Sequence, residues 1–470
     1  MTQDNSQPNK DPKQNSENSS STTALDETSN NTAYGLNSIA SAYYSSAYGA
    51  NSTASGMRAT AIGSGSLAEG AFSNALGTNT QAQSTVSTAI GTGAKAYGAY
   101  GTAAGGMAIA EGDYSTAVGA STLVRGANST AVGSNIYVEG DYSIAVGMFA
   151  NVSGANSIAV GANVNAAGAS SIAIGQGSAA SADSSSSYGA TSLAGASKTV
   201  AIGYGAKATS SGSTTIGVAS AATGSNSIAF GMNSNASNVG STAIGANGVA
   251  SGVNSSALGQ GSIASAANST ALGYGSTANG INSTATGQAS SASGDFSIAA
   301  GQGSRATGED GIAIGQGSAA SGDLSTAIGA ASTTEGHFSL AVGHNSNAVA
   351  DNSVAIGQDS MASGVGSTAM GQNSRSSDLY SVALGSASVT APQISTPQIN
   401  ISGNIYQFAG SNPQATFSIG NYTTNRMTRT LTNLAAGRID GNSTDAINGS
   451  QLYALVQAIE AINTRLNNPD

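Results

Sequence analysis

Glycine recurs every 14 residues from Gly35 to Gly385 with no insertion or deletion, which gives 26 copies of one short unit. Alanine stands two residues before this glycine in 24 copies, and an apolar residue stands directly before it in all copies except that of Thr286. A helix is excluded, since each interior Gly costs about 1 kcal/mol relative to Ala. A second glycine follows seven residues later in 16 of the 25 intervals, where a second tight turn would lie. The sequence therefore predicts an all-β solenoid in which each copy is one coil of a β-roll.

Two sets of side-chain columns follow from the alternation of side chains along a strand. The alanine two before the glycine and the small residue five after it, such as Ala61 and Ala68, are predicted to face each other across a thin interior. The residue directly before the glycine then points outward, as does the Thr, Ile, Val or Leu three before it. An apolar column of this length exceeds the patch that a soluble monomer usually exposes. We therefore expect further copies of the chain to cover it, with interface positions that include Ile62, Ile90, Ile174, Ile202 and Ile244. In the alternative register, the two faces of the strand are exchanged, so that this apolar column points inward and forms the roll's own core.

The period divides the chain into five segments. Residues 1–30 are polar and are predicted to be a disordered leader, and residues 31–385 form the roll. Three prolines punctuate residues 386–430, which are predicted to form irregular strands and turns. Residues 431–451 join this connector to a heptad pattern over residues 452–470, which predicts the start of a coiled coil. Its seam positions are Leu452, Leu455, Ile459, Ile462 and Leu466.

Composition excludes several classes of function. The formal net charge of −10 disfavours nucleic acid, which requires a basic surface. There is no cysteine, which excludes disulfides and thiol-ligated metals. No run of 18 apolar residues predicts a membrane-spanning helix, and residues 1–30 lack the apolar region of a secretory signal peptide. Attachment to an outer membrane is expected only if a longer parent chain supplies the anchor.

Catalysis and metal binding are also disfavoured. The only histidines, His337 and His344, are seven residues apart without a third ligand, so we expect two solvated side chains. The words Glu111-Gly-Asp113 and Glu139-Gly-Asp141 gather carboxylates, but Ca²⁺ usually takes six or more oxygens, so a solvated acidic corner is expected. The unbroken 14-residue intervals leave no long loop from which to build a cleft. We therefore predict no catalytic residues, no cofactor and no metal.

Several words in the sequence resemble one family. Thr-Ala-Ile-Gly at 60–63, Ser-Ile-Ala-Ile-Gly at 171–175 and Asn-Ser-Val-Ala-Ile-Gly-Gln-Asp-Ser at 352–360 resemble the head repeats of the YadA-like trimeric autotransporter adhesins. The segments 417–420, 431–438 and 444–452 are similar to the neck that joins this head to a coiled-coil stalk. The resemblance implies a left-handed parallel β-roll, a homotrimer, a place on the cell surface and adhesion to host extracellular matrix or cells.

The resemblance also implies candidate ligand residues. In the family, the word found at 352–360 is linked with collagen binding, so collagen or another matrix protein is the implied partner. The candidate residues are Asn352, Ser353, Val354, Ala355, Ile356, Gly357 and Ser360. The same residues also define the coil, so the word is alternatively pure scaffold. A tail-fibre or spike module of a phage, or a purely spacing solenoid, are the alternative functions.

The predicted neck must pass from wide rolls to a narrow coiled coil. Arg426, Arg429 and Arg438 are predicted to reach carboxylates such as Asp440 and Asp445 on a neighbouring subunit. Leu434 and Ile447 are predicted to supply apolar contact at the trimer interface.

Overall fold

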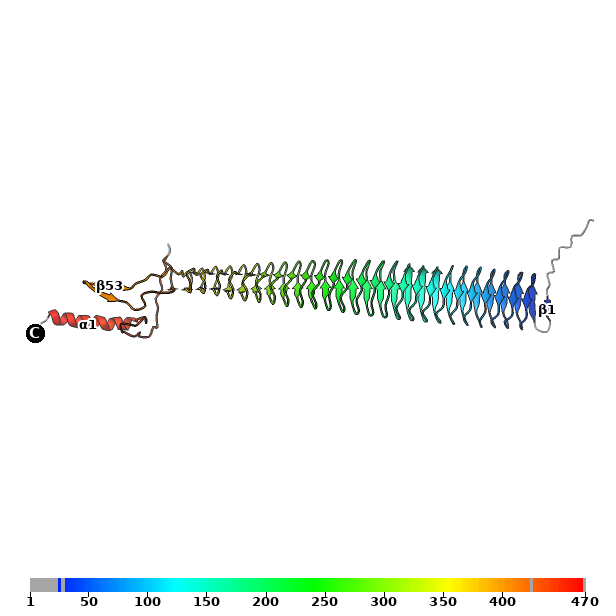
Figure 1. Cartoon of the computed structure of the whole chain (residues 1–470), viewed down its shortest axis with the longest axis horizontal. Helices are drawn as coiled ribbons and strands as arrows, with labels where there is room; N and C mark the ends of the chain where they lie inside the picture. The colour runs from blue at the N-terminus through cyan, green and yellow to red at the C-terminus, as the bar shows by residue number, and fades with distance from the viewer. Residues whose placement is uncertain (1–23, 27–29, 423–425, 468–470) are drawn as a thin grey trace, which may run out of the picture. The chain divides into compact units, whose positions relative to one another are not determined.

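The computed structural model describes residues 24–26, 30–422 and 426–467. The chain divides into two compact units, Met1–Asn226 and Ser227–Asp470. In each unit, short strands stack coil upon coil, as Figure 1 shows. The predicted parallel β-solenoid is confirmed.

Unit 1 contains one sheet of longer strands and one of two-residue strands. The long-strand sheet begins with β2 (Asn31–Tyr34) and β4 (Ser46–Tyr48) and adds an even-numbered strand every 14 residues up to β28 (Thr214–Ile216). The short-strand sheet runs in the same way over the odd-numbered strands from β3 (Ile39–Ala40) to β29 (Ala221–Ala222). Neighbours are parallel and shifted by one repeat, so that Ala173 of β22 (Ile172–Ile174) pairs with Ser187 of β24 (Ser186–Tyr188).

Unit 2 repeats this arrangement and adds the C-terminal elements. Its long strands run from β30 (Ile228–Phe230) to β52 (Val382–Leu384), and its short strands from β31 (Asn235–Ala236) to β51 (Arg375–Ser376), again every 14 residues. An antiparallel hairpin follows, made of β53 (Gln398–Ile401) and β54 (Asn404–Gln407). The last elements are β55 (Phe417–Ser418) and helix α1 (Gly449–Asn467), which covers most of the predicted heptad segment.

The interior of the roll is built from alanine, as predicted. Ala61 and Ala68 are both 0% exposed, which confirms the inward columns. Two copies replace the strand alanine by a polar residue, and each finds a partner inside the coil. The hydroxyl of Ser187 lies 2.6 Å from that of Ser192, and the hydroxyl of Thr215 donates to that of Ser220 at 2.6 Å. These replacements are tolerated because both buried hydroxyls are satisfied.

The turn after the long strand depends on a glycine and a small hydroxyl side chain. Gly203 has a φ of +131°, and a Cβ there would lie 2.4 Å from the carbonyl oxygen of Gly217 in the next coil. Three residues after the glycine, a buried serine usually donates to the glycine carbonyl, as Ser52 does to Gly49 at 2.8 Å. Glycine is therefore required at this corner by both conformation and space.

Three coils of unit 1 depart from this turn. Ile136, Ala150 and Val164 replace the serine and are buried, and Val124, Val138 and Val152 enlarge the interior. The long strands of these coils extend through the glycine to five residues: β16 (Thr130–Ser134), β18 (Ile144–Met148) and β20 (Ile158–Ala162). Loss of the serine hydroxyl alone does not cause this extension, because Ala94, Ala108 and Ala206 also replace the serine while the long strands of their coils keep three residues.

The structure differs from the predicted segment boundaries at both ends. Most of the predicted disordered leader lies outside the described residues, but β1 (Ala24–Asp26) pairs antiparallel with β2. At the other end, the roll sheet does not stop with the period at Gly385. Strand β55 pairs with β52 in parallel, with Val382 opposite Phe417 and Ala383 opposite Ser418. Phe417-Ser-Ile-Gly420 therefore occupies the place of one more repeat word, after an excursion that includes the hairpin.

Candidate functional site

The outer face of the long-strand sheet carries the predicted interface isoleucines. Ile62 and Ile90 are 41% and 44% exposed, and Ile174, Ile202 and Ile244 are 36–37% exposed, so all point away from the interior. No charged residue occupies either outward position of this sheet in any of the 26 copies. The outward position of the short-strand sheet, in contrast, includes Lys95, Lys207, Arg305 and Arg375. The long-strand face therefore has the composition of a covered surface, and the short-strand face that of a solvated one.

The candidate ligand word at 352–360 lies mostly within the roll. Ser353, Ala355 and Ser360 are buried, and the two serines donate to the carbonyls of Ala350 and Gly357 at 2.6 and 2.8 Å. Gly357 has the turn conformation, with a φ of +127°.

Three of the seven candidate residues in the word face outward. Asn352 is exposed, whereas Val354 and Ile356 are half-buried on the long-strand face. A ligand that stays outside the coil can reach these three side chains and cannot reach the buried ones.

The acidic words of unit 1 are largely occupied by contacts within the chain. Arg125 lies between Glu111 and Glu139, with N–O distances of 3.0 and 3.5 Å. Asp113 accepts the backbone N–H of Ala99 at 2.8 Å, and Asp141 accepts that of Ala127 at 2.7 Å. These aspartates accept N–H groups from the preceding coil at an exposed turn.

His337 belongs to a similar ladder in unit 2. Its Nδ1 accepts the backbone N–H of Asp323 at 3.1 Å, and its own backbone N–H donates to Asp351 at 2.9 Å. The residues that the structure describes contain no group of three or more His, Cys, Asp or Glu side chains able to hold a metal ion.

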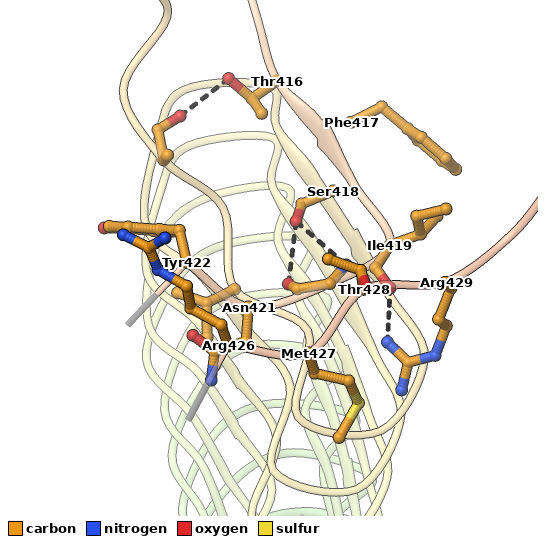
Figure 2. Close-up of a pocket in the computed structure, with 13 residues that line it drawn as sticks. Thr416, Phe417, Ser418, Ile419, Asn421, Tyr422, Arg426, Met427, Thr428 and Arg429 are labelled. Atoms are coloured by element: carbon orange, nitrogen blue, oxygen red, sulfur yellow. Dashed lines mark hydrogen bonds between the residues drawn. The ribbon is translucent and has the colours of Figure 1, made fainter. Parts of the chain in front are cut away.

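A groove of about 640 Å³ lies where the roll ends, and sequence reasoning did not identify it. Figure 2 shows it between β55 and the returning segment around Met427. Phe417 and Tyr422 are 60% and 56% exposed on it. The sequence feature that indicates this groove is the segment Phe417-Ser-Ile-Gly420, which resembles the repeated sequence of the roll but lies outside the 14-residue period.

Arg429 fastens this end of the roll, although it was predicted to reach a carboxylate on a neighbour. Its guanidinium donates to the hydroxyl of Ser388 at 2.9 Å and to the carbonyls of Ile419 and Ser386. Its partners are therefore uncharged groups of the same chain. Arg429 is a structural clamp across the returning strand.

The neck pairs Arg438 with Asp445 within the chain. Arg438 Nε and Nη2 contact the two carboxylate oxygens at 2.8 and 3.0 Å. Gln451 bonds both backbone groups of Gly437, so the neck loop is also tied to the first turn of α1. The apolar side chains predicted for the trimer interface remain uncovered in the single chain, with exposed fractions from 40% for Leu434 to 74% for Leu466. Ile447 and the seam residues Leu452, Leu455, Ile459 and Ile462 lie between these values.

We expect Asp445 to titrate below its ordinary pKa of 3.8. The side-chain hydrogen bond from Arg438, followed by its backbone N–H, lowers the pKa of Asp445. A depressed pKa stabilises the folded neck above pH 3.8, and that contribution is lost as the pH falls through the lower folded value. Carbon-detected NMR of aspartate-labelled protein measures the midpoint. In Arg438→Gln the midpoint should rise towards 3.8, and an unchanged midpoint would show that the pair does not form in solution.

No helix within the described ranges is both long and apolar enough to cross a membrane.

The family model described as "YadA head domain repeat (2 copies)" matches twelve stretches that together cover more than half of the chain. These stretches are residues 40–66, 54–80, 82–108, 96–122, 110–135, 139–163, 222–247, 250–276, 278–304, 306–332, 335–360 and 362–388. A second family model, described as "Coiled stalk of trimeric autotransporter adhesin", matches residues 430–469.

Individual relatives match shorter parts of the chain. The autotransporter adhesin BtaE of Brucella suis biovar 1 (strain 1330) is 48% identical over 75 residues, which span 16% of this chain and 10% of BtaE. The collagen-binding domain of the Yersinia adhesin YadA is 33% identical, with a TM-score of 0.31, over 38% of this chain and 85% of that domain. The C-terminal YadA-like domain of BPSL2063 from Burkholderia pseudomallei is 46% identical, with a TM-score of 0.22, over 23% of this chain and 49% of that one. By its head repeats and its stalk, the chain belongs to the YadA-like trimeric autotransporter adhesins.

Proposed function

We propose that this chain is the head, neck and first stalk turns of a homotrimeric adhesin on the cell surface, which attaches to host extracellular matrix. The observation that carries the proposal is the uncharged, apolar outer face of the long-strand sheet in each unit. Apolar surface left in water costs about 25 cal/mol per Å². Covering the face with the same face of two further copies removes that cost.

The C-terminal segment supports the same assembly. Helix α1 has no buried residue, and its apolar side chains at heptad spacing would be covered in a coiled coil. Two heptads alone are too short for a stable helix in water. The proposed trimer therefore depends on the stalk seam and the long-strand faces together.

Collagen is the matrix protein that we propose first as the ligand. The support is the sequence similarity to the collagen-binding domain of the Yersinia adhesin YadA. Of the seven candidate residues in the word, only Asn352, Val354 and Ile356 face outward, and the two apolar ones belong to the face assigned to the trimer. We therefore propose that ligand affinity comes from many weak contacts repeated along three chains, which is an avidity effect.

Solid-phase binding tests this function. The parent protein, verified as a trimer by light scattering, should bind immobilised collagen more strongly than fibronectin, laminin or albumin. A monomeric variant of the same chain should bind at least tenfold more weakly, because avidity is lost. If a verified trimer binds none of the three matrix proteins, the chain is not a matrix adhesin.

A further inference from the structure

A polar hollow of about 270 Å³ opens beside the short-strand sheet of unit 2. It spans three consecutive coils at the turn that follows the long strand. Each coil contributes one turn residue and one residue of the short strand, so the hollow has two columns of side chains. The turn column is Asn345, Asp359 and Asn373, and the strand column is Asn347, Met361 and Arg375.

The turn column is held in place by the backbone. Asn345, Asp359 and Asn373 have φ values of 56–57°, a conformation that Asn and Asp tolerate better than most residues. The amide of Asn345 donates to Oδ1 of Asp359 at 2.7 Å. Asp359 is half-buried, and its second carboxylate oxygen accepts no hydrogen bond from the described residues.

Two further groups in the hollow lack a matching partner within the described part of the chain. Oδ1 of Asn347 is buried and accepts no hydrogen bond. The guanidinium of Arg375 contacts the sulfur of Met361 at 3.6 Å and makes no ion pair there. The Asn347 oxygen is closed to solvent and does not reach a ligand, whereas the Arg375 side chain is exposed and its fork fits a carboxylate.

The same positions in the two preceding coils hold no charged or amide side chain. Gly317 and Ala331 stand in the turn column, and Ala319 and Thr333 stand in the strand column. The roll therefore does not need polar side chains here. From the unused carboxylate oxygen of Asp359 and the unpaired guanidinium of Arg375, we infer that the hollow binds a dipolar pair on a protein ligand. That pair is a lysine or arginine side chain next to an aspartate or glutamate side chain.

This inference rests on the proposed adhesin function and adds a discrete subsite to it. The cation of the ligand would donate to Asp359, and its carboxylate would accept from Arg375. Asp359→Asn tests the first contact, because Asn fits the turn and still accepts from Asn345. Arg375→Gln tests the second. Arg305→Gln is the matched control, since Arg305 is exposed at the same strand position five coils earlier.

The probe is the acetylated and amidated peptide Gly-Lys-Gly-Glu-Gly, with binding followed by NMR titration of the full chain. We expect Asp359→Asn and Arg375→Gln each to weaken binding at least tenfold, and Arg305→Gln to leave it unchanged. Replacing either charged residue of the peptide by Gln should have the same effect as the matching protein variant. Free 6-aminohexanoic acid is a second probe. If it binds saturably and as strongly as the peptide, and the two variants weaken its binding, the dipolar site is supported and its ligand is a small zwitterion. No binding to the parent, or equal binding to all variants, would overturn the inference.

Collagen binding of the same variants separates the two proposals. If the parent binds collagen and all variants bind both collagen and peptide equally, the subsite is wrong while the adhesin function stands. If the peptide binds as expected but no matrix protein does, the matrix function fails while the subsite stands.

Discussion

The triple variant Ile174→Asp, Ile202→Asp, Ile244→Asp should be monomeric at 45.2 kDa, even with the neck and helix α1 intact. Each substitution removes about 1.5–3 kcal/mol of apolar burial from every chain of the proposed trimer. It also places a carboxylate on a face that carries no cation in any copy. Because all three side chains point outward from the roll, circular dichroism should still report a folded β structure. Light scattering measures the mass.

The matched control changes the opposite wall of the same coils. Ala179→Asp, Lys207→Asp and Val249→Asp add three carboxylates to the short-strand sheet, where charged residues already occur. This control should remain trimeric. A triple isoleucine variant that is as trimeric and as heat-resistant as the parent would mean that the long-strand face is exposed to solvent.

Gly203→Ala should open the roll locally at a cost on the order of 3–5 kcal/mol. The new Cβ would lie 2.4 Å from the Gly217 carbonyl, a backbone group that the ladder holds in place, and the φ of +131° is strained for alanine. Repeat arrays do not unfold in a single two-state step, so a global melting temperature would understate the effect. Hydrogen exchange should instead show lost protection in β24, β26 (Val200–Ile202) and β28.

Gly205→Asn is the control for this glycine. Gly205 has a φ of +64°, and its nearest neighbour for a new Cβ is the Thr191 hydroxyl at 3.9 Å. Asn163 and Asn233 occupy the same turn position with φ values of 55°. The control should therefore change stability by less than about 1 kcal/mol and leave exchange unchanged. If both variants lose protection equally, the effect of Gly203→Ala comes from the conformational entropy of the turn and not from the close approach of neighbouring coils.

The roll could be predicted from its sequence because its constraints repeat. Gly203 and its equivalents must be glycine in every coil, so the period is unbroken, whereas the second turn accepts residues such as Ser84 and Asn238 in the glycine position. Ala61 and Ala68 could be assigned to the interior because strand alternation leaves room there only for small side chains. The replacements of that alanine at Ser187 and Thr215 gave no such indication, since their partners Ser192 and Ser220 lie five residues away in the turn before the short strand.

The end of the roll and the polar hollow depend on single contacts and could not be predicted. The pairing of Phe417 with Val382 joins residues separated by the whole hairpin excursion, and no periodicity spans that gap. The partners of Arg429 are backbone carbonyls and a serine, which composition does not single out. In the candidate word at 352–360, strand alternation predicts the outward Val354 and Ile356 and the inward Ala355, whereas the burial of Ser353 and Ser360 depends on the turn geometry.

The excursion between Thr390 and Thr416 has a practical consequence for protein engineering. Thr390 is 1% exposed at the end of one coil, and β55 resumes the parallel sheet after the hairpin of β53 and β54. A coil of this solenoid thus accommodates a long excursion at its second corner when the strand after it restores the ladder. The equivalent corners of earlier coils are therefore candidate grafting sites, at which antigenic loops could be displayed at intervals of a chosen number of coils within one unit.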